Sequence, residues 1–364
     1  MSPEKFLYSC GSLKGSERLQ KRGLLKQRVN QLQIDESTSV ADLVEAMGQM
    51  SIQARNIGLC AKVLKGIYRD KARPTVFLGL AGPLIAAGLR RVIRDLVVKG
   101  AVDVIVSTGA IIYQDLYAAL GFGHFIGIPA VQDGHLRDLL IDRIYDTYID
   151  EEKVWQADQF CAQVADELAP AMLSSRAFVA KLAEKITDEE SILYQCRKCG
   201  VPIFVPALND SSIGIGLTEH RVRAKQSGKP AVVIDAIADN CEILQLVVKS
   251  KKTAAFYVAG GVPKNYINDS IVMGYLYGRQ RGHDYALQIT TAVTQDGGLS
   301  SSTLSEGQSW GKVKKDAKFA MAWVEPSVAL PLLSGYIFGR KLTQGRRRLK
   351  LDWQEGELKW AKAR

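Results

Sequence analysis

Apolar positions recur at helical spacing near the start of the chain. From Leu43 through Met50 and on to Ile67 they lie mostly three or four residues apart, the spacing that places side chains on one face of a helix. We therefore expect residues 40–70 to form a helical N-terminal region.

Beyond residue 74 the pattern changes to short apolar runs that are rich in β-branched side chains. Helical patterns at 89–99, 158–172 and 175–186 separate most of these runs. This alternation is typical of an α/β fold built around a mostly parallel sheet. The runs that predict strands are 75–80, 102–107, 201–205, 231–237, 255–258, 285–291 and 319–324.

Sheets of this kind bind their ligands beyond the carboxyl ends of the strands, so we expect a site in the connections that follow the predicted strands. The connection at 290–312 is the longest polar one, and loops of such length are usually functional or disordered. Glycine turns at 79–88, 260–261 and 296–298 allow backbone to approach a ligand closely. Each turn alone is a weak signal, but three turns at three strand ends favour a cofactor site.

Composition narrows the class of protein. With 364 residues, 47% hydrophobic and 24% charged, the chain is not an intrinsically disordered, collagen-like or small disulfide-rich protein. It has no uninterrupted apolar run of about 18 residues, and its start lacks the pattern of a secretion signal. These features, with only six cysteines, predict a soluble protein of the reducing cytoplasm with no membrane partner.

The net charge of +10 is concentrated near the C-terminus. Residues 339–364 contain nine Lys/Arg and three Asp/Glu, which is +6 of that +10. Arg346-Arg-Arg348 with Trp353 and Trp360 could contact phosphates and bases. A short basic run is a weak signal, however, so a solvated arm, or one that packs on a neighbouring subunit, is the favoured interpretation. We do not expect a nucleic-acid partner.

Metal and hydrolase chemistry have little support in the sequence. Cys196 and Cys199 have metal or redox spacing, but a structural zinc needs four ligands and no second pair of cysteines exists. The chain has no G-x-S-x-G or H-E-x-x-H motif, and none of its four histidines lies beside a nucleophile in sequence. We expect no metal site.

Lys312 is the strongest candidate for covalent chemistry. It ends the long polar connection in Glu306-Gly-Gln-Ser-Trp310-Gly-Lys312. A lysine amine can form an imine with a carbonyl or exchange with another imine if burial frees the neutral amine. Trp310 could supply an apolar wall and bind a cation through its ring face, while Glu306 could anchor a second cationic end. The alternative is an ordinary surface lysine.

Ser309-Trp-Gly-Lys312, preceded by Glu306, resembles the catalytic signature of the deoxyhypusine synthase family. The similarity runs from about Gln53 to Leu333 in the family's order. Within the family, the chain is most similar to the bacterial deoxyhypusine synthase-like branch, which is related to homospermidine synthase. The remaining matching motifs are Gln53-Ala-Arg-Asn56, Phe77-Leu-Gly79, Asp103-Val-Ile-Val-Ser-Thr108, Pro206-Ala-Leu-Asn-Asp210, Gly260-Gly-Val-Pro-Lys264 and Thr291-Ala292.

The resemblance implies a Rossmann-like domain that binds NAD, with helices on both faces of its sheet. That domain would span residues 39–338, between an N-terminal segment (1–38) and a basic C-terminal tail (339–364). The resemblance also implies a homotetramer with sites shared between subunits. The positions that would contact NAD are Gly82, Pro83, Thr108, Gly109, Asp210, Gly260, Thr291, Ala292 and Glu325.

The resemblance also implies a mechanism. The family oxidises an amine donor with NAD, moves a four-carbon aminobutyl unit onto the active-site lysine as an imine, passes it to an acceptor amine and reduces it again. Lys312 would be the imine-forming lysine, Trp310 the wall against the amine chain and Glu306 an anchor for its ammonium. Such a site must exclude water, because an exposed imine hydrolyses.

Four positions depart from the eukaryotic pattern for binding the donor amine. Ile215 and Leu299 stand where that pattern has aspartates, Asn265 where it has a histidine, and Gln114 where it has a glutamate. Each lost charge-assisted contact is worth about 1.5–3 kcal/mol. We therefore expect small amine substrates, with homospermidine synthesis as the most concrete version. Two alternatives remain open: a true deoxyhypusine synthase that modifies a translation-factor lysine, and a non-catalytic NAD-binding regulatory protein.

Overall fold

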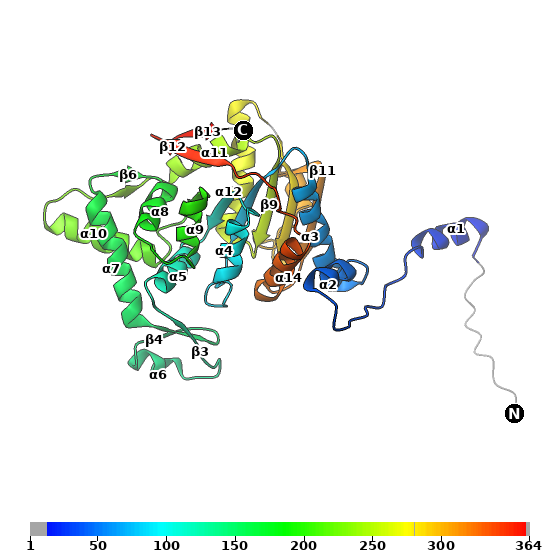
Figure 1. Ribbon diagram of the computed structural model, residues 1–364, viewed down its shortest axis with the longest axis horizontal. Coiled ribbons are helices and arrows are strands. Elements are labelled where there is room, and N and C mark those ends of the chain that lie inside the picture. Colours follow the sequence, from blue (N-terminus) through cyan, green and yellow to red (C-terminus); the bar gives the residue numbers. More distant parts are fainter. Residues whose placement is uncertain (1–12, 280, 362–364) are drawn as a thin grey trace.

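The computed structural model describes residues 13–279 and 281–361. Its centre is a six-stranded sheet in which neighbouring strands are parallel (Figure 1). The α/β class and the parallel sheet expected from the sequence are confirmed. Across the sheet the order is β11 (Val313–Ala322), β10 (His283–Ile289), β9 (Thr253–Val258), β1 (Thr75–Leu80), β2 (Val104–Ser107) and β7 (Ile203–Phe204).

Alternate side chains of the central strands pack on opposite faces of the sheet, because successive residues of a strand point to opposite sides. On β1, Leu78 belongs to the hydrophobic cluster of one face and Phe77 to that of the other. The helical region expected at 40–70 is confirmed as two helices with a short break between them. The first face is covered by α2 (Val40–Met47), α3 (Ile52–Arg69), α4 (Arg90–Val98), α5 (Gly109–Ala119) and α14 (Pro326–Gly339), and the second by α11 (Ala236–Lys249) and α12 (Gly261–Val272).

A further group of helices lies beside the β7 edge of the sheet, on the left of Figure 1. It comprises α7 (Glu151–Leu168), α8 (Ser175–Glu184), α9 (Ile192–Cys199) and α10 (Ser212–Gln226).

The prediction of a central-sheet strand at 231–237 is wrong, because the strand in the structure is shorter and has a different partner. In the structure β8 (Val233–Ile234) has two residues and pairs with β6 (Met172–Leu173), outside the central sheet. The strand stops early because Asp235 caps the next helix. Its side chain accepts hydrogen bonds from the backbone N–H groups of Ile237 and Ala238 and so begins α11.

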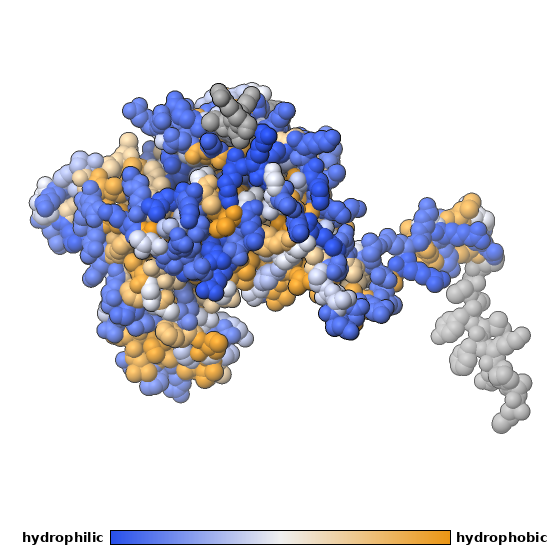
Figure 2. Space-filling view, in the orientation of Figure 1, coloured by the Kyte–Doolittle hydropathy of each residue, from blue (hydrophilic) through white to orange (hydrophobic). Residues whose placement is uncertain are grey.

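A small antiparallel unit projects from the body at the bottom of Figure 1. It contains β3 (His124–Ile126), α6 (Asp133–Asp138), β4 (Ile141–Ile144) and β5 (Thr147–Asp150). Figure 2 shows apolar side chains gathered over this unit. At the other side of the molecule α1 (Gly15–Leu24) lies apart from the rest, and none of its residues is buried. In the part of the chain that the structure describes, no helix is long and apolar enough to span a membrane.

The connection between β10 and β11 crosses the whole height of the sheet. Because the two strands are parallel neighbours, the chain leaves the carboxyl end of β10 at Thr290 and returns to the amino end of β11 at Lys312. This crossover, residues 290–312, contains η2 (Thr294–Asp296) and the short helix α13 (Glu306–Ser309). Its Leu304 joins the hydrophobic cluster on the α12 face. The long polar connection predicted here is confirmed.

The basic tail packs on its own chain as far as residue 361. Arg348 donates hydrogen bonds to the backbone carbonyl groups of Val97 and Val98 at the end of α4, and Leu358 is buried. A helix C-terminus favours such cationic partners. The structure thus corrects the expectation of a solvated arm. The tail forms a hairpin of β12 (Lys350–Gln354) and β13 (Glu357–Ala361).

Asp103 joins this tail to the sheet. Its buried carboxylate lies 2.7 Å from a guanidinium nitrogen of Arg73, pairs with Arg346 and accepts a hydrogen bond of 2.9 Å from the Val76 N–H group. Burial alone would raise the pKa of Asp103, but the positive charges of Arg346 and Arg73 outweigh it and hold the pKa below its ordinary value. The pairing therefore stabilises the fold above pH of about 4 and loses this effect as the pH falls through the lowered pKa.

We predict that Asp103→Asn lowers the free energy of unfolding at pH 7 by about 3–5 kcal/mol, because it leaves buried guanidinium groups without a counter-charge. Denaturant unfolding at several pH values measures this loss, which should shrink as the pH is lowered from 7 towards 2. The control is Arg347→Met at an exposed neighbouring position, with an expected change within about 0.5 kcal/mol. A loss that is equal at all pH values would contradict the ion-pair explanation.

Candidate functional site

The side chain of Lys312 reaches from the amino end of β11 onto α12. Its Nζ lies 3.0 Å from Oδ1 of Asn265 and 3.3 Å from Oδ1 of Asp269. The side chain is only 16% exposed, and its Nζ lies 5.5 Å from the centroid of the Trp310 ring. The structure therefore brings together Lys312, Trp310 and Asn265 from the predicted set and adds Asp269.

Asn265 and Asp269 share one face of α12. Their spacing of four residues places them one helical turn apart, and Nδ2 of Asn265 donates a hydrogen bond of 2.8 Å to Oδ2 of Asp269. One carboxylate oxygen is thus held by the amide while the other faces Lys312. Asp269 was missed from the sequence, although a polar pair at i and i+4 after a Gly-Gly turn was a usable signal.

Lys264, the neighbour of Asn265, anchors the crossover. Its side chain is 1% exposed, and its Nζ donates to the backbone oxygens of Leu299 (3.1 Å) and Ser302 (2.6 Å) and to Oγ of Ser302 (3.1 Å). Burial lowers the pKa of Lys264 to about 8. Lys264 therefore holds the crossover, and the next residue of α12, Asn265, holds the amine of Lys312 at the end of the crossover.

Trp310 and Glu306 are more exposed within one chain than a wall and an anchor for the amine would be. Trp310 is 72% exposed, so within one chain its ring is open to solvent apart from its contact with Lys312. The exposed Glu306 carboxylate accepts hydrogen bonds from N (2.6 Å) and Oγ1 (2.7 Å) of Thr303, which lower the pKa of Glu306 below its ordinary value. The Glu306 N–H donates back to Oγ1 of Thr303. This reciprocal pair begins α13, and it orients the Glu306 carboxylate.

The predicted cofactor positions lie along the carboxyl edge of the sheet. Gly82, after β1, has a φ of 87°, which residues with a side chain rarely adopt. At Gly109, the first residue of α5, a Cβ atom would lie 2.3 Å from Oγ of Ser211. At Gly260, just before α12, a Cβ atom would lie 2.6 Å from the Ser300 backbone. The other predicted positions at this edge are Pro83, Thr108, Asp210, Thr291, Ala292 and Glu325.

Several helix N-termini converge on the same edge. Helices α5, α10, α12 and α14 each begin within about ten residues of the carboxyl end of a strand, where their first N–H groups can bind an anion. The N-cap residues Thr108 and Ser211 make no side-chain cap bond, whereas Glu325 accepts a hydrogen bond from the Ser327 N–H group. Backbone donors and a carboxylate are the groups that bind the phosphates and ribose of a dinucleotide. The residues present therefore fit such a cofactor.

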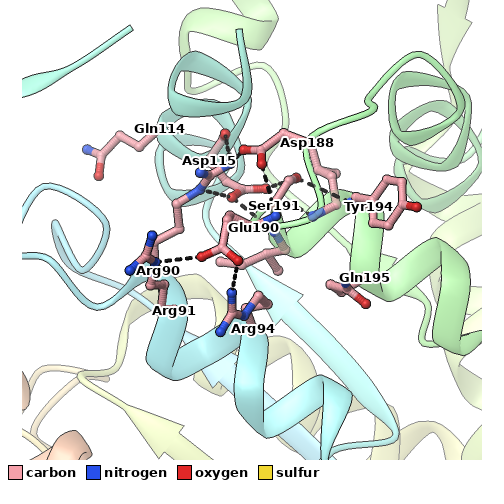
Figure 3. A network of polar contacts seen from close by, with 12 residues as sticks. Arg90, Arg91, Arg94, Gln114, Asp115, Asp188, Glu190, Ser191, Tyr194 and Gln195 are labelled. Atoms are coloured by element: carbon pink, nitrogen blue, oxygen red, sulfur yellow. Dashed lines mark hydrogen bonds and ion pairs between the residues drawn. The ribbon is translucent and has the colours of Figure 1, made fainter. Parts of the chain in front are cut away.

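A buried ion-pair network supports the turn after β1 (Figure 3). Nε of Arg90 lies 2.7 Å from Oδ1 of Asp115. The other oxygen of this carboxylate, Oδ2, accepts a hydrogen bond of 2.7 Å from Oγ of Ser191. Gln114 points away from this network (Figure 3), and its Oε1 accepts a hydrogen bond from the Ala86 N–H group. Gln114, a predicted substrate-binding residue, thus holds the turn in place within one chain.

Ile215 does not lie near Lys312 in one chain. It is an exposed residue of α10, which packs on α7 and α5. Lys312 precedes β11, and α5 follows β2. These two strands are four positions apart in the sheet, which at about 4.8 Å per position is about 19 Å. Leu299, in contrast, lies on the crossover. The predicted substrate set is therefore split: Asn265 contacts Lys312, Leu299 contacts Lys264, the neighbour of Asn265, and Gln114 and Ile215 lie elsewhere.

Metal-ligating residues do not cluster in residues 13–279 or 281–361, where no group of three or more His, Cys, Asp or Glu could hold an ion. Cys196 and Cys199 are free thiols. Cys196 is fully buried, and desolvation raises the pKa of its thiol well above the ordinary value, which makes it a poor nucleophile.

We predict that Lys264→Met loosens the crossover, because it removes the donor from two backbone carbonyl groups. Hydrogen exchange of the amides in residues 299–303 should become about tenfold faster or more, as expected for losing a charge-assisted hydrogen bond. Lys315→Met, at an exposed position of β11, is the control and should leave this exchange unchanged. Equal exchange in the two variants would show that Lys264 does not hold the crossover.

Comparison with known proteins places the chain in a family. Residues 42–337 match the family model "Deoxyhypusine synthase". The chain is 42% identical to the deoxyhypusine synthase-like protein of Chlorobaculum tepidum over 90% of this chain and 94% of the relative. It is 38% identical to the protein of that name from Caulobacter vibrioides, over 90% of each. A crystal structure of an Entamoeba histolytica protein assigned as a deoxyhypusine synthase has the same fold, with a TM-score of 0.58, 17% identity and coverage of 85% of this chain and 97% of that one. The chain therefore belongs to the deoxyhypusine synthase family of transferases.

Proposed function

We propose that the protein is an NAD-dependent aminobutyl transferase of polyamine metabolism that works through an imine on Lys312. One observation carries the proposal: the side chain of Lys312 is only 16% exposed, and its amine lies over the Trp310 ring and is held on α12 by Asn265. A surface lysine would place its amine in solvent. This Lys312 is held in a defined position, as an imine-forming residue must be.

The proposed reaction balances around Lys312. A hydride leaves the carbon beside the donor nitrogen, which gives an imine. The neutral amine of Lys312 adds to that carbon, and the remainder of the donor leaves as an amine. The acceptor amine then displaces Lys312, and the hydride returns to the same carbon, so that no net oxidation occurs. Bound NAD takes up and returns this hydride.

The positions of the predicted cofactor residues support NAD. At Gly82 the space that a Cβ atom would take is open, and helix N-termini at the carboxyl edge supply N–H donors for phosphates. Glu325 would accept hydrogen bonds from ribose hydroxyls. Thr291 and Ala292 begin the crossover that ends at Lys312. The cofactor would thus lie at the carboxyl edge, where the crossover that leads to Lys312 begins.

The apolar residues Leu299 and Ile215 support free amines as the substrates, with homospermidine synthesis as the most concrete version. A long polycation would need carboxylates at these positions. The first alternative is a true deoxyhypusine synthase, in which the acceptor is a lysine of a translation factor. A non-catalytic NAD-binding role is the second alternative, and it requires no held amine at Lys312.

We predict that Lys312→Arg abolishes amine transfer, because a guanidinium keeps the charge but forms no imine under these conditions. Polyamine products from spermidine or putrescine with NAD are measured by mass spectrometry, and NAD binding by calorimetry. The expected result is no product with unchanged NAD affinity, whereas the control Lys315→Arg keeps full activity. Transfer by Lys312→Arg would rule out the lysine imine, and absence of transfer by the wild type with bound NAD would favour the non-catalytic role.

We further propose that the chain assembles as a homo-oligomer, in agreement with the tetramer implied by the family. The separation of Ile215 from Lys312 in one chain supports it, as does the apolar surface over β3, α6 and β4 (Figure 2). Ile126 on this unit is 99% exposed and Phe125 also protrudes. Contiguous exposed apolar residues of this kind mark interaction surfaces.

We predict that the pair Phe125→Ser and Ile126→Ser lowers the mass in solution measured by light scattering, because it removes apolar contact area. Leu19→Ser and Leu24→Ser, at exposed apolar positions of α1, form the control and should leave the mass unchanged. A wild-type protein that is monomeric would refute the oligomer, and an unchanged mass of the double variant would move the interface elsewhere.

A further inference from the structure

We propose that Asp269 is the carboxylate that binds the ammonium group of the amine donor, and that it exchanges this ammonium for the side chain of Lys312. The inference rests on the proposed function, since it names the residue that recognises the substrate. It concerns a position on α12 outside the set expected from the sequence.

The geometry gives Asp269 one committed oxygen and one available oxygen. Oδ2 accepts the hydrogen bond from Nδ2 of Asn265 at 2.8 Å, which fixes the carboxylate plane. Oδ1 lies 3.3 Å from Nζ of Lys312. The Asp269 side chain is 48% exposed while that of Lys312 is 16% exposed. About half of the Asp269 side chain is therefore open to solvent, so a dissolved cation can reach it.

The neighbouring groups differ from Asp269 in their contact with the Lys312 amine. The Glu306 carboxylate also has one committed oxygen, which accepts two hydrogen bonds from Thr303, but Asp269 is the carboxylate that pairs with Nζ of Lys312. Leu299 is apolar, and its carbonyl group already accepts from Lys264. Among the groups that the structure places in contact with the Lys312 amine, Asp269 is the one with a negative charge.

The balance of charge explains why exchange follows substrate binding. Lys264 and Lys312 are the cations of the site, and Glu306 and Asp269 are the anions, so the four groups are neutral together at rest. A donor ammonium adds positive charge beside one available carboxylate. Because Oδ1 of Asp269 is the oxygen that pairs with Lys312, the ammonium takes the place of the Lys312 amine at this carboxylate. The Lys312 amine is thereby released from its ion pair and can turn towards the carbon of the bound donor.

The test compares the wild type with Asp269→Asn, which keeps the shape of the side chain and removes its charge. Full-length protein with bound NAD is treated briefly with acetic anhydride at pH 8, and acetylation of Lys312 is measured by peptide mass relative to Lys315 as an internal reference. Acetylation of Lys312 in the resting protein should rise several-fold in Asp269→Asn, because the amine is no longer held in the ion pair with this carboxylate.

The second readout is the amine dependence of transfer. The KM for spermidine or putrescine should rise about tenfold or more in Asp269→Asn, the loss expected for one charge-assisted contact, while kcat at saturating amine and NAD affinity stay near the wild-type values. Glu184→Gln, at an exposed position of α8 that pairs with Lys181, is the matched control and should change neither readout.

The two readouts distinguish this inference from the proposed function. Unchanged acetylation together with unchanged KM in Asp269→Asn would overturn the role of Asp269 while leaving the transferase intact. If the wild type transfers no amine, the proposed function fails, and acetylation then decides alone: an increase in Asp269→Asn supports the pairing, and no increase refutes it. A fall in kcat with unchanged KM would contradict an ammonium-binding role.

Discussion

The parallel pairing of β10 with β11 is the constraint on which the site depends. A chain that joins parallel neighbours has to travel back along the whole sheet, and here it does so as the polar crossover 290–312 rather than as a long helix. The crossover therefore begins at the carboxyl edge, where the predicted cofactor residues lie, and ends at Lys312. One segment thereby links the carboxyl edge of the sheet to the amine of Lys312.

Helix α12 fixes the positions of the crossover and of the Lys312 amine. Lys264 holds the crossover through three hydrogen bonds, and Asn265 binds the Lys312 amine. The buried charge of Lys264 is costly, since desolvation lowers its pKa to about 8, and a lysine is retained in such a place only where its donors are fully used. Elsewhere in the sheet, the ion pair between Asp103, which precedes β2, and Arg346 holds the C-terminal tail against the core.

The fold was largely predictable because strand runs and helical patterns are local signals. The crossover was also recognisable, because its length and composition are unusual for a connection between strands. Lys312 could be singled out through the motif around it. The Asp103–Arg346 pair lies 243 residues apart in sequence, and the short strand at Val233 depends on the cap formed by Asp235. Such pairings depend on tertiary structure, so no local pattern predicts them. Asp269 is intermediate, since its spacing from Asn265 was visible but its contact with Lys312 was not.

The central claim is that Lys312 receives the transferred group, and covalent trapping tests it most directly. Purified protein is incubated with NAD and, separately, with putrescine, spermidine or agmatine, then reduced with borohydride and analysed by peptide mass. An imine is reduced to a stable secondary amine, so we expect an adduct of aminobutyl size on Lys312 with at least one donor. An adduct on Lys264 instead, or none with any donor while NAD is bound, would contradict the account.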